Sequence, residues 1–136
     1  MTKSIEVFEG DYRFLSNFYV HLPDGRSNEH LYQMMKTFDA DWQRRIYNAQ
    51  TPNAAKKLGR QAPLVPNWEA IKVDIMYALC LAKFSRPQLR RQLLNTGTVP
   101  LVEGNTWGDT FWGVCEGKGD NHLGAILMDV RSVICD

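Results

Sequence analysis

The sequence has few cysteines, no long apolar run and no targeting leader, and each absence argues against a class of protein. Its three cysteines (Cys80, Cys115 and Cys135) form no CxxC pair and cannot all pair within the chain, which argues against a secreted disulfide scaffold. The longest apolar run, residues 75–82, is far too short to span a bilayer. No basic-then-apolar leader follows Met1. We therefore expect a cytoplasmic protein with no membrane partner.

Net charge is also nearly absent. Lys and Arg number 16 against 15 for Asp and Glu, so the net charge of +1 argues against a surface that is basic throughout. The charges are nevertheless uneven, because residues 36–91 carry eleven basic and four acidic side chains, whereas residues 92–136 carry two basic and six acidic ones. The basic middle segment could bind an anion such as a phosphate. Alternatively, its charges form solvated helix faces that pair with the acidic segments.

The 136 residues, 44% of them hydrophobic, are typical of one globular domain, and their pattern predicts a helix-dominated α+β fold with a few short strands. Ser27 or Asn28 can cap a helix that opens at Glu29, after a turn at residues 23–25. Its apolar residues recur at spacings of three and four, which predicts a core face: Leu31, Met34, Met35 and Phe38. Other helices are expected near residues 42–47, 51–59, 68–84, 85–97 and 121–134, and short strands at 5–8 and 101–103.

Standard catalytic and metal-binding motifs are missing from the sequence. The three histidines (His21, His30 and His122) do not have metal-ligand spacing, and the cysteines do not join them. There is no P-loop and no GxSxG motif. We therefore expect no metal and no cofactor, and a serine-hydrolase mechanism is disfavoured.

The segment from Glu29 to Lys36 is the most informative part of the chain. On a helix, Glu29, Gln33 and Lys36 fall at positions i, i+4 and i+7, so they project from one face opposite the methionines. A carboxylate, a carboxamide and an amine in one line can bind, activate and protonate a polar substrate. Any amphipathic helix also has a polar stripe, so the spacing alone leaves a simple solvated face open.

Three further features each have a functional and a structural interpretation. Ser16 and Asn17 can bond the backbone in a turn or reach into a pocket. Asp109 is a loop carboxylate that sugar chemistry could use, or one that caps a turn or is solvated. The tryptophans at loop–helix junctions or in the glycine-rich loop can stack on a planar base or pack in the core: Trp68, Trp107 and Trp112.

Short motifs follow one another in order along nearly the whole chain. They include Phe14-Leu-Ser-Asn-Phe-Tyr19, Glu29-His-x-Tyr-Gln-x-x-Lys36, Asn67-Trp68-Glu69, Ala82-Lys83-Phe84, Leu101-Val-Glu103, Asp109-x-x-Trp112-Gly113 and Gly119-x-Asn121-x-Leu-Gly124. With these motifs the chain resembles the NADAR/YbiA-like family of N-glycosidases. The resemblance implies one YbiA-like α+β domain over residues 1–136.

The resemblance also implies an activity, which is metal-independent hydrolysis of an N-glycosidic bond. The implied substrates are riboflavin biosynthesis intermediates such as ribosylaminopyrimidine 5′-phosphates, in which a C1′–N bond joins a ribose phosphate to a base-like leaving group. The alternatives are removal of ADP-ribose from guanine bases of nucleic acid and a module that binds ADP-ribose without cleaving it. The expected partners are thus a small ribosyl-phosphate or ADP-ribosyl molecule, or ADP-ribosylated nucleic acid.

Carried over to matching positions, the resemblance implies catalytic roles for Glu29, Lys36 and Asp109. The substrate-binding residues that we expect are Ser16, Asn17, Phe18, Gln33, Arg60, Trp68, Lys83, Trp112 and Asn121, with Arg60 and Lys83 binding the phosphate. The chain departs from the family pattern at Asn28, where the family has Ser, and at Trp112-Gly113-Val114-Cys115, where glycines are commoner. The second departure leaves the shape of this loop and the choice of substrate open.

Two routes fit these residue types. Direct hydrolysis passes through an oxocarbenium-like state, which needs a carboxylate near C1′ and a proton donor for the base. In the other route Lys36 captures C1′ as a Schiff base and Glu29 transfers protons. Either way, we expect Glu29, Lys36, Trp68 and the 104–121 loop to share one pocket.

Overall fold

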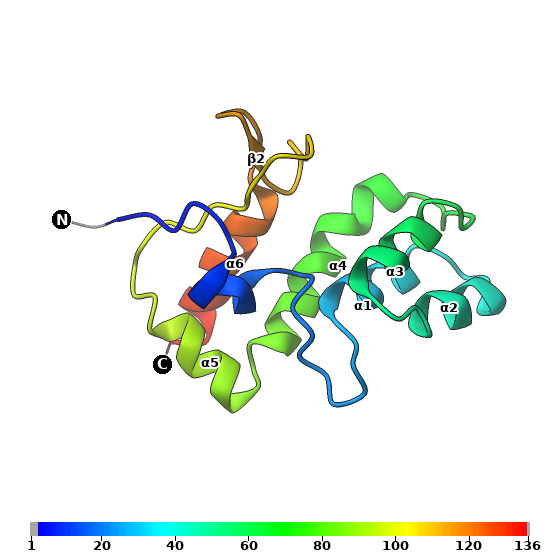
Figure 1. Cartoon of the computed structure of the whole chain (residues 1–136), viewed down its shortest axis with the longest axis horizontal. Helices are drawn as coiled ribbons and strands as arrows, with labels where there is room; N and C mark the ends of the chain where they lie inside the picture. The colour runs from blue at the N-terminus through cyan, green and yellow to red at the C-terminus, as the bar shows by residue number, and fades with distance from the viewer. Residues whose placement is uncertain (1–2, 136) are drawn as a thin grey trace. The chain divides into compact units, whose positions relative to one another are not determined.

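The computed structural model describes residues 3–135, which form two compact units. We call Asn17–Leu79 the central unit, and the residues up to Ser16 together with those from Cys80 onward the terminal unit. The boundary falls inside the longest helix, α4 (Trp68–Lys83), which is green in Figure 1. The expectation that residues 1–136 act as one domain stays a prediction.

Three short helices form the body of the central unit. They pack against one another in Figure 1 and are α1 (Asn28–Met35), α2 (Ala40–Tyr47) and α3 (Pro52–Gly59). Each starts at a side-chain oxygen that accepts a backbone N–H, and these N-caps are Ser27, Asp39 and Thr51. The sequence predicts the caps at Ser27 and Thr51, but not the one at Asp39. Buried Ile46, Ala55 and Ala62 form the small apolar core beneath them. Capping and a small core thus fix where these helices begin and how they pack.

The terminal unit combines helices with a minimal sheet. Its elements are η1 (Gly10–Leu15), α5 (Pro87–Leu94), β1 (Gly104–Asn105), β2 (Val114–Cys115) and α6 (His122–Val133). β1 and β2 are parallel, with Gly104 opposite Val114. The strands expected at 5–8 and 101–103 are reduced to a single parallel bridge between Ile5 and Leu101. Within residues 3–135, two strands of two residues each stand beside seven helices (η1 included), which agrees with the predicted helix-dominated α+β class.

Two helix starts differ from the sequence-based prediction. The pattern of Ser85 to Gln88 predicts a capping box, but none forms, because the Ser85 hydroxyl donates back to the Leu81 carbonyl at 2.7 Å. α5 therefore starts from Arg86 without a side-chain cap. The sequence also predicts that Asn121 caps the last helix. It does precede α6, but its backbone is left-handed (φ 53°) and its side chain makes no cap bond. Within residues 3–135, no helix has the length and apolar character needed to cross a membrane.

Candidate active site

Helix α1 buries its polar face. The sequence-based prediction is the opposite, with the apolar residues in the core and the polar face turned away from it. Glu29 is 7% exposed, His30 0% and Gln33 2%. Met35 is 48% exposed and Phe38, beyond the helix end, is 80% exposed. The prediction that Leu31, Met34, Met35 and Phe38 form a core face is therefore wrong, although Met34 does pack partly against the small apolar core. Periodicity identifies the two faces of a helix, but the tertiary contacts decide which face is buried.

The buried polar groups of α1 bond to one another and to the backbone. Gln33 Nε2 donates to Glu29 Oε2 at 2.5 Å, one turn apart on the helix. The His30 ring contacts the Ser27 hydroxyl at 2.9 Å and the Ala49 carbonyl oxygen at 3.0 Å. The Glu29 backbone N–H donates to the Asn17 carbonyl at 2.9 Å, which fixes the start of α1. These bonds make burial of the polar face tolerable, since unpartnered buried polar groups are costly.

One buried acceptor on this face has no bond partner among residues 3–135. It is Gln33 Oε1, which lies directly against the backbone of Gly59 at the end of α3. A Cβ atom at position 59 would lie 1.8 Å from Gln33 Oε1. Only glycine therefore lets α3 approach α1 closely enough to hold the carboxamide beside Glu29.

Substituting Gly59 with alanine should lower activity without comparable loss of stability. The new methyl group must displace the Gln33 amide and with it the bond to Glu29, while alanine favours the helix by about 1 kcal/mol. We expect kcat/KM to fall about tenfold or more, because displacement of catalytic groups by an ångström has effects of this size. Urea unfolding beside kinetics tests this. Lys57→Ala, an exposed site on the same helix, is the control, and equal activity of both variants would contradict the assignment.

Lys36 closes α1 and lies among charged groups of the central unit. Burial lowers the pKa of its amine below the usual 10.5, the Glu29 carboxylate partly offsets this, and the nearby cations Arg60, Lys56 and Lys72 lower it further. Its Nζ lies 5.7 Å from the centre of the Tyr32 ring. A lysine in this environment loses its proton more readily than a solvated one, and only the unprotonated amine is a nucleophile.

Aromatic rings flank this group of side chains. Tyr32 and Trp68 are both 5% exposed, and their ring centres are 5.3 Å apart. Phe18 is 39% exposed, and the Lys56 ammonium lies 5.8 Å from its ring centre. Asn17 Nδ2 donates to the sulfur of Met76 at 3.4 Å. Within the central unit, then, the structure brings together seven of the predicted site residues: Asn17, Phe18, Glu29, Gln33, Lys36, Arg60 and Trp68.

Asp109, Trp112 and Asn121 lie in the terminal unit, where their hydrogen bonds and ring contacts hold the glycine-rich loop. Asp109 Oδ1 accepts the backbone N–H groups of Phe111 at 3.1 Å and of Trp112 at 2.9 Å. Asn121 accepts from Glu103 N at 2.9 Å and donates to the Leu101 carbonyl at 3.0 Å. The Trp112 ring meets the Phe111 ring edge-on, with centres 4.8 Å apart. Their predicted functional roles stay predictions.

Lys83 and Ser16 also belong to the terminal unit. The Lys83 side chain is 1% exposed, and its amine donates to the Ser16 carbonyl at 2.9 Å. Burial lowers the pKa of Lys83 to about 7, and the neighbouring Cys80 partly offsets this. This contact gives the lysine a structural function. Its predicted contact with a substrate phosphate stays a prediction.

Replacing Lys83 with methionine should make stability less dependent on pH. Below pH 7 the native protein buries a charged amine, whereas above it the native amine is neutral and the unfolded one stays charged up to about 10.5. The free energy of unfolding of the wild type should therefore rise by about 1.4 kcal/mol per pH unit over this window, relative to the variant. Urea unfolding near pH 6 and near pH 9 measures this difference. A stability difference that does not change with pH would contradict the lowered pKa.

Comparison with known proteins places these features in a family. Residues 7–135 match the NADAR domain family. The chain belongs to this family. It is 37% identical over 130 residues to N-glycosidase YbiA of Escherichia coli, covering 89% of this chain and 81% of the relative. The NMR structure of E. coli YbiA superimposes with a TM-score of 0.84 at 33% identity, covering 99% of this chain and 87% of that one.

A plant relative extends the comparison. The chain is 33% identical over 153 residues to the riboflavin biosynthesis protein PYRR of Zea mays, covering 97% of this chain but 24% of the maize protein. The NADAR match and the YbiA likeness confirm the predicted family and fold. The names of the relatives agree with the predicted enzyme class, a hydrolase of N-glycosyl compounds.

Several residues of this NADAR protein were not predicted as part of the site. Tyr32 lies inside the Glu29–Lys36 motif, and this position in the sequence indicates that its ring lies near the site. The sequence predicts that a helix ends at Gly59, but no sequence pattern indicates its contact with Gln33. Lys56 and Lys72 reach the surroundings of Lys36 from two other helices, which only the packing reveals. Across residues 3–135, no three His, Cys, Asp or Glu side chains converge as metal ligands.

Proposed function

We propose that this NADAR protein hydrolyses the C1′–N bond of a ribosyl phosphate, and that the polar face of α1 carries the reaction. The observation that supports this most is the buried Glu29 carboxylate, bonded to Gln33, on the same helix as a lysine whose pKa is lowered. A buried carboxylate on the same helix as a lysine with a lowered pKa is typical of active sites. Neither group is explained by folding alone, because both are costly to bury.

Lys36 acts as the nucleophile in this proposal. Its neutral amine attacks C1′, the C1′–N bond to the base breaks, and the Glu29 carboxylate passes a proton from the lysine nitrogen to the leaving base. As the C1′–O4′ bond of the ribose then breaks, the remaining proton of the lysine nitrogen passes to O4′, which gives a Schiff base between C1′ and Lys36. Water adds to C1′, and the Glu29 carboxylate carries the water proton to the lysine nitrogen. Release of ribose phosphate regenerates the lysine.

The cations around Lys36 suit a phosphorylated sugar. Lys56 and Arg60 come from α3 and the residue that follows it, while Lys72 comes from α4, where its Nζ also lies 2.7 Å from Glu69 Oε1. All three lower the pKa of Lys36. A substrate phosphate bound among them would be held by charge-assisted hydrogen bonds, and Arg60 can bind it in bidentate fashion.

The name of the maize relative, a riboflavin biosynthesis protein, supports a substrate from riboflavin synthesis, and a ribosylaminopyrimidine 5′-phosphate is the class that the family resemblance implies. We propose this class of molecule, with ADP-ribosylated guanine as the competing possibility. Both contain a ribosyl C1′–N bond and at least one phosphate. They differ in the leaving group and in what remains attached to the sugar, so the released products distinguish them.

A substrate panel tests the proposed function. Purified protein, treated with EDTA, is incubated separately with a ribosylaminopyrimidine 5′-phosphate and with ADP-ribosylated DNA, and the products are separated by chromatography. We expect release of ribose 5-phosphate from the first substrate and no loss of rate on chelation. Release of ADP-ribose alone would replace the substrate. Tight ADP-ribose binding without turnover of either would show a binding module.

A further inference from the structure

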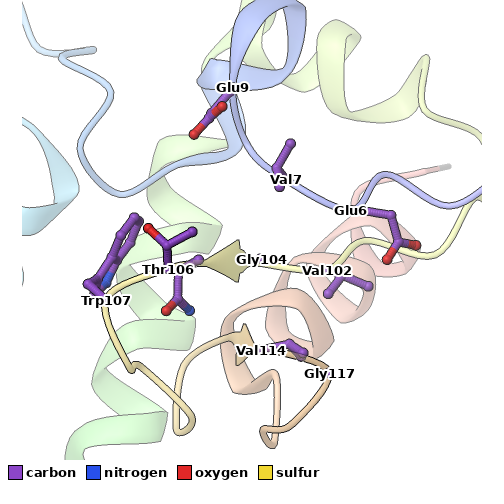
Figure 2. A pocket seen from close by; sticks show the side chains of 10 residues that line it. Glu6, Val7, Glu9, Val102, Gly104, Thr106, Trp107, Val114 and Gly117 are labelled. Atoms are coloured by element: carbon purple, nitrogen blue, oxygen red, sulfur yellow. The ribbon is translucent and has the colours of Figure 1, made fainter.

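The terminal unit contains a pocket that the proposed function does not use. Its volume is about 310 Å³, at the lower end of the range for small-molecule sites. The residues that matter for its chemistry come from two stretches of chain far apart in sequence: Glu6, Val7, Glu9, Val102, Thr106 and Trp107. Figure 2 shows them around the space between the N-terminal segment and β1.

The floor of the pocket is held rigidly by backbone bonds. Val102 N donates to the Ile5 carbonyl at 2.8 Å, and Gly104 N donates to the Glu6 carbonyl at 3.1 Å. A Cβ atom on Gly104 would lie 2.2 Å from that same Glu6 oxygen, so the close approach of the two segments requires glycine. These backbone bonds belong to the fold itself, so they form this side of the pocket before any ligand binds.

Trp107 stands at one side of this pocket with 61% of its surface exposed. The chain turns directly after it at Gly108, whose φ of 85° favours glycine. Because most of this indole ring is exposed to water, its burial contributes little to the stability of the fold. Such a ring beside a preformed pocket offers an aromatic face on which a planar ligand can stack.

Glu9 is the second notable side chain. It occupies the N-cap position of η1, yet its side chain makes no capping hydrogen bond. Figure 2 shows its carboxylate on the side of the pocket where the Thr106 hydroxyl and the Trp107 ring lie, whereas Glu6 lies beside Val102. The described lining has two carboxylates and no Lys or Arg side chain. This charge repels phosphates and favours hydrogen-bond donors or cations.

We propose that this pocket binds a planar nitrogen heterocycle that carries amino groups. The ring stacks on Trp107, its amino groups donate to the Glu9 carboxylate, and its apolar edge faces Val7. Protonation of the heterocycle strengthens binding, since the carboxylates compensate the charge. This binding is independent of the proposed N-glycosidase activity, because the pocket lies in the terminal unit and the experiment measures binding rather than turnover.

A titration of the full chain with 2,4-diaminopyrimidine tests the proposal, followed by ¹H–¹⁵N NMR. We expect saturable shifts of the Trp107 indole N–H and of the Thr106 and Gly117 amides. 2,4-Dimethylpyrimidine, which has the same ring without donors, should bind about tenfold or more weakly, as expected for loss of hydrogen bonds to a charged group. Turnover does not enter this readout, so failure of the proposed enzymatic function would leave it unaffected.

Matched variants locate the binding. Trp107→Ala should weaken 2,4-diaminopyrimidine binding about tenfold, as loss of a stacking platform does. Glu9→Gln should remove most of the preference for the amino-bearing ring, and Phe38→Ala, an exposed aromatic of the central unit, should change nothing. Equal binding of the two pyrimidines, shifts confined to other residues, or unchanged affinity in both pocket variants would each overturn the proposal.

Discussion

Replacing Lys36 with arginine is expected to abolish turnover while leaving the fold intact. Arginine keeps the positive charge, but its guanidinium stays protonated and cannot attack C1′. The rate should fall by about three orders of magnitude or more, since the nucleophile of the reaction is lost. Steady-state kinetics measure the loss and urea unfolding checks the fold. Lys57→Arg, the same exchange at an exposed site of α3, is the matched control.

The wild-type pH profile adds a readout that a structural role would not change. Because the reactive form is the free amine, kcat/KM should rise with pH through the Lys36 pKa. Burial and three neighbouring cations place that pKa below 10.5, so the rise should be complete at a lower pH than for a solvated lysine. If the arginine variant turns over normally, Lys36 is only an electrostatic group. Direct hydrolysis with Glu29 as the carboxylate beside C1′ would then replace the Schiff base.

Replacing Glu29 with glutamine should have the second largest effect. The amide preserves the size of the side chain and a hydrogen-bond acceptor for Gln33 Nε2, but it cannot transfer a proton. We expect kcat to fall about 10²- to 10⁴-fold, the range for loss of a general acid or base. The free energy of unfolding should change little or increase, because a buried charge is removed.

The substitution of Glu29 also tests the electrostatics of the site. Glu29 raises the pKa of Lys36, so its neutralisation should lower that pKa further. A ¹⁵N-lysine NMR titration measures this change independently of turnover. Asp129→Asn, which neutralises an exposed carboxylate on α6, is the control and should affect neither quantity. Normal activity of Glu29→Gln would remove the carboxylate from the reaction.

Local signals in the sequence predicted the helices of the central unit well. Ser27 and Thr51-Pro52 begin α1 and α3 as expected, because capping depends on neighbouring residues alone. The alignment of Glu29 with Gln33 also follows from helical spacing, and the hydrogen bond between them agrees with it. Residues within about one helical turn of each other are enough to specify these features.

Features that depend on contacts between distant segments could not be predicted. The burial of the polar face of α1 results from its packing in the central unit, and the periodicity of its residues fits either orientation. The approach of Gly59 to Gln33 and the convergence of Lys56 and Lys72 near Lys36 have the same origin. The position of Lys83 is similar, since a helical lysine normally reaches solvent, yet here its amine bonds the Ser16 carbonyl.

Trapping the covalent intermediate tests the central claim most directly. Wild-type protein is mixed with a ribosylaminopyrimidine 5′-phosphate and quenched with borohydride, which reduces a Schiff base to a stable secondary amine. Peptide mass spectrometry then locates the added sugar phosphate. We predict a single adduct, on Lys36, that is absent from the Lys36→Arg variant. An adduct on another lysine, or active turnover with no adduct at all, would contradict Lys36 as the nucleophile.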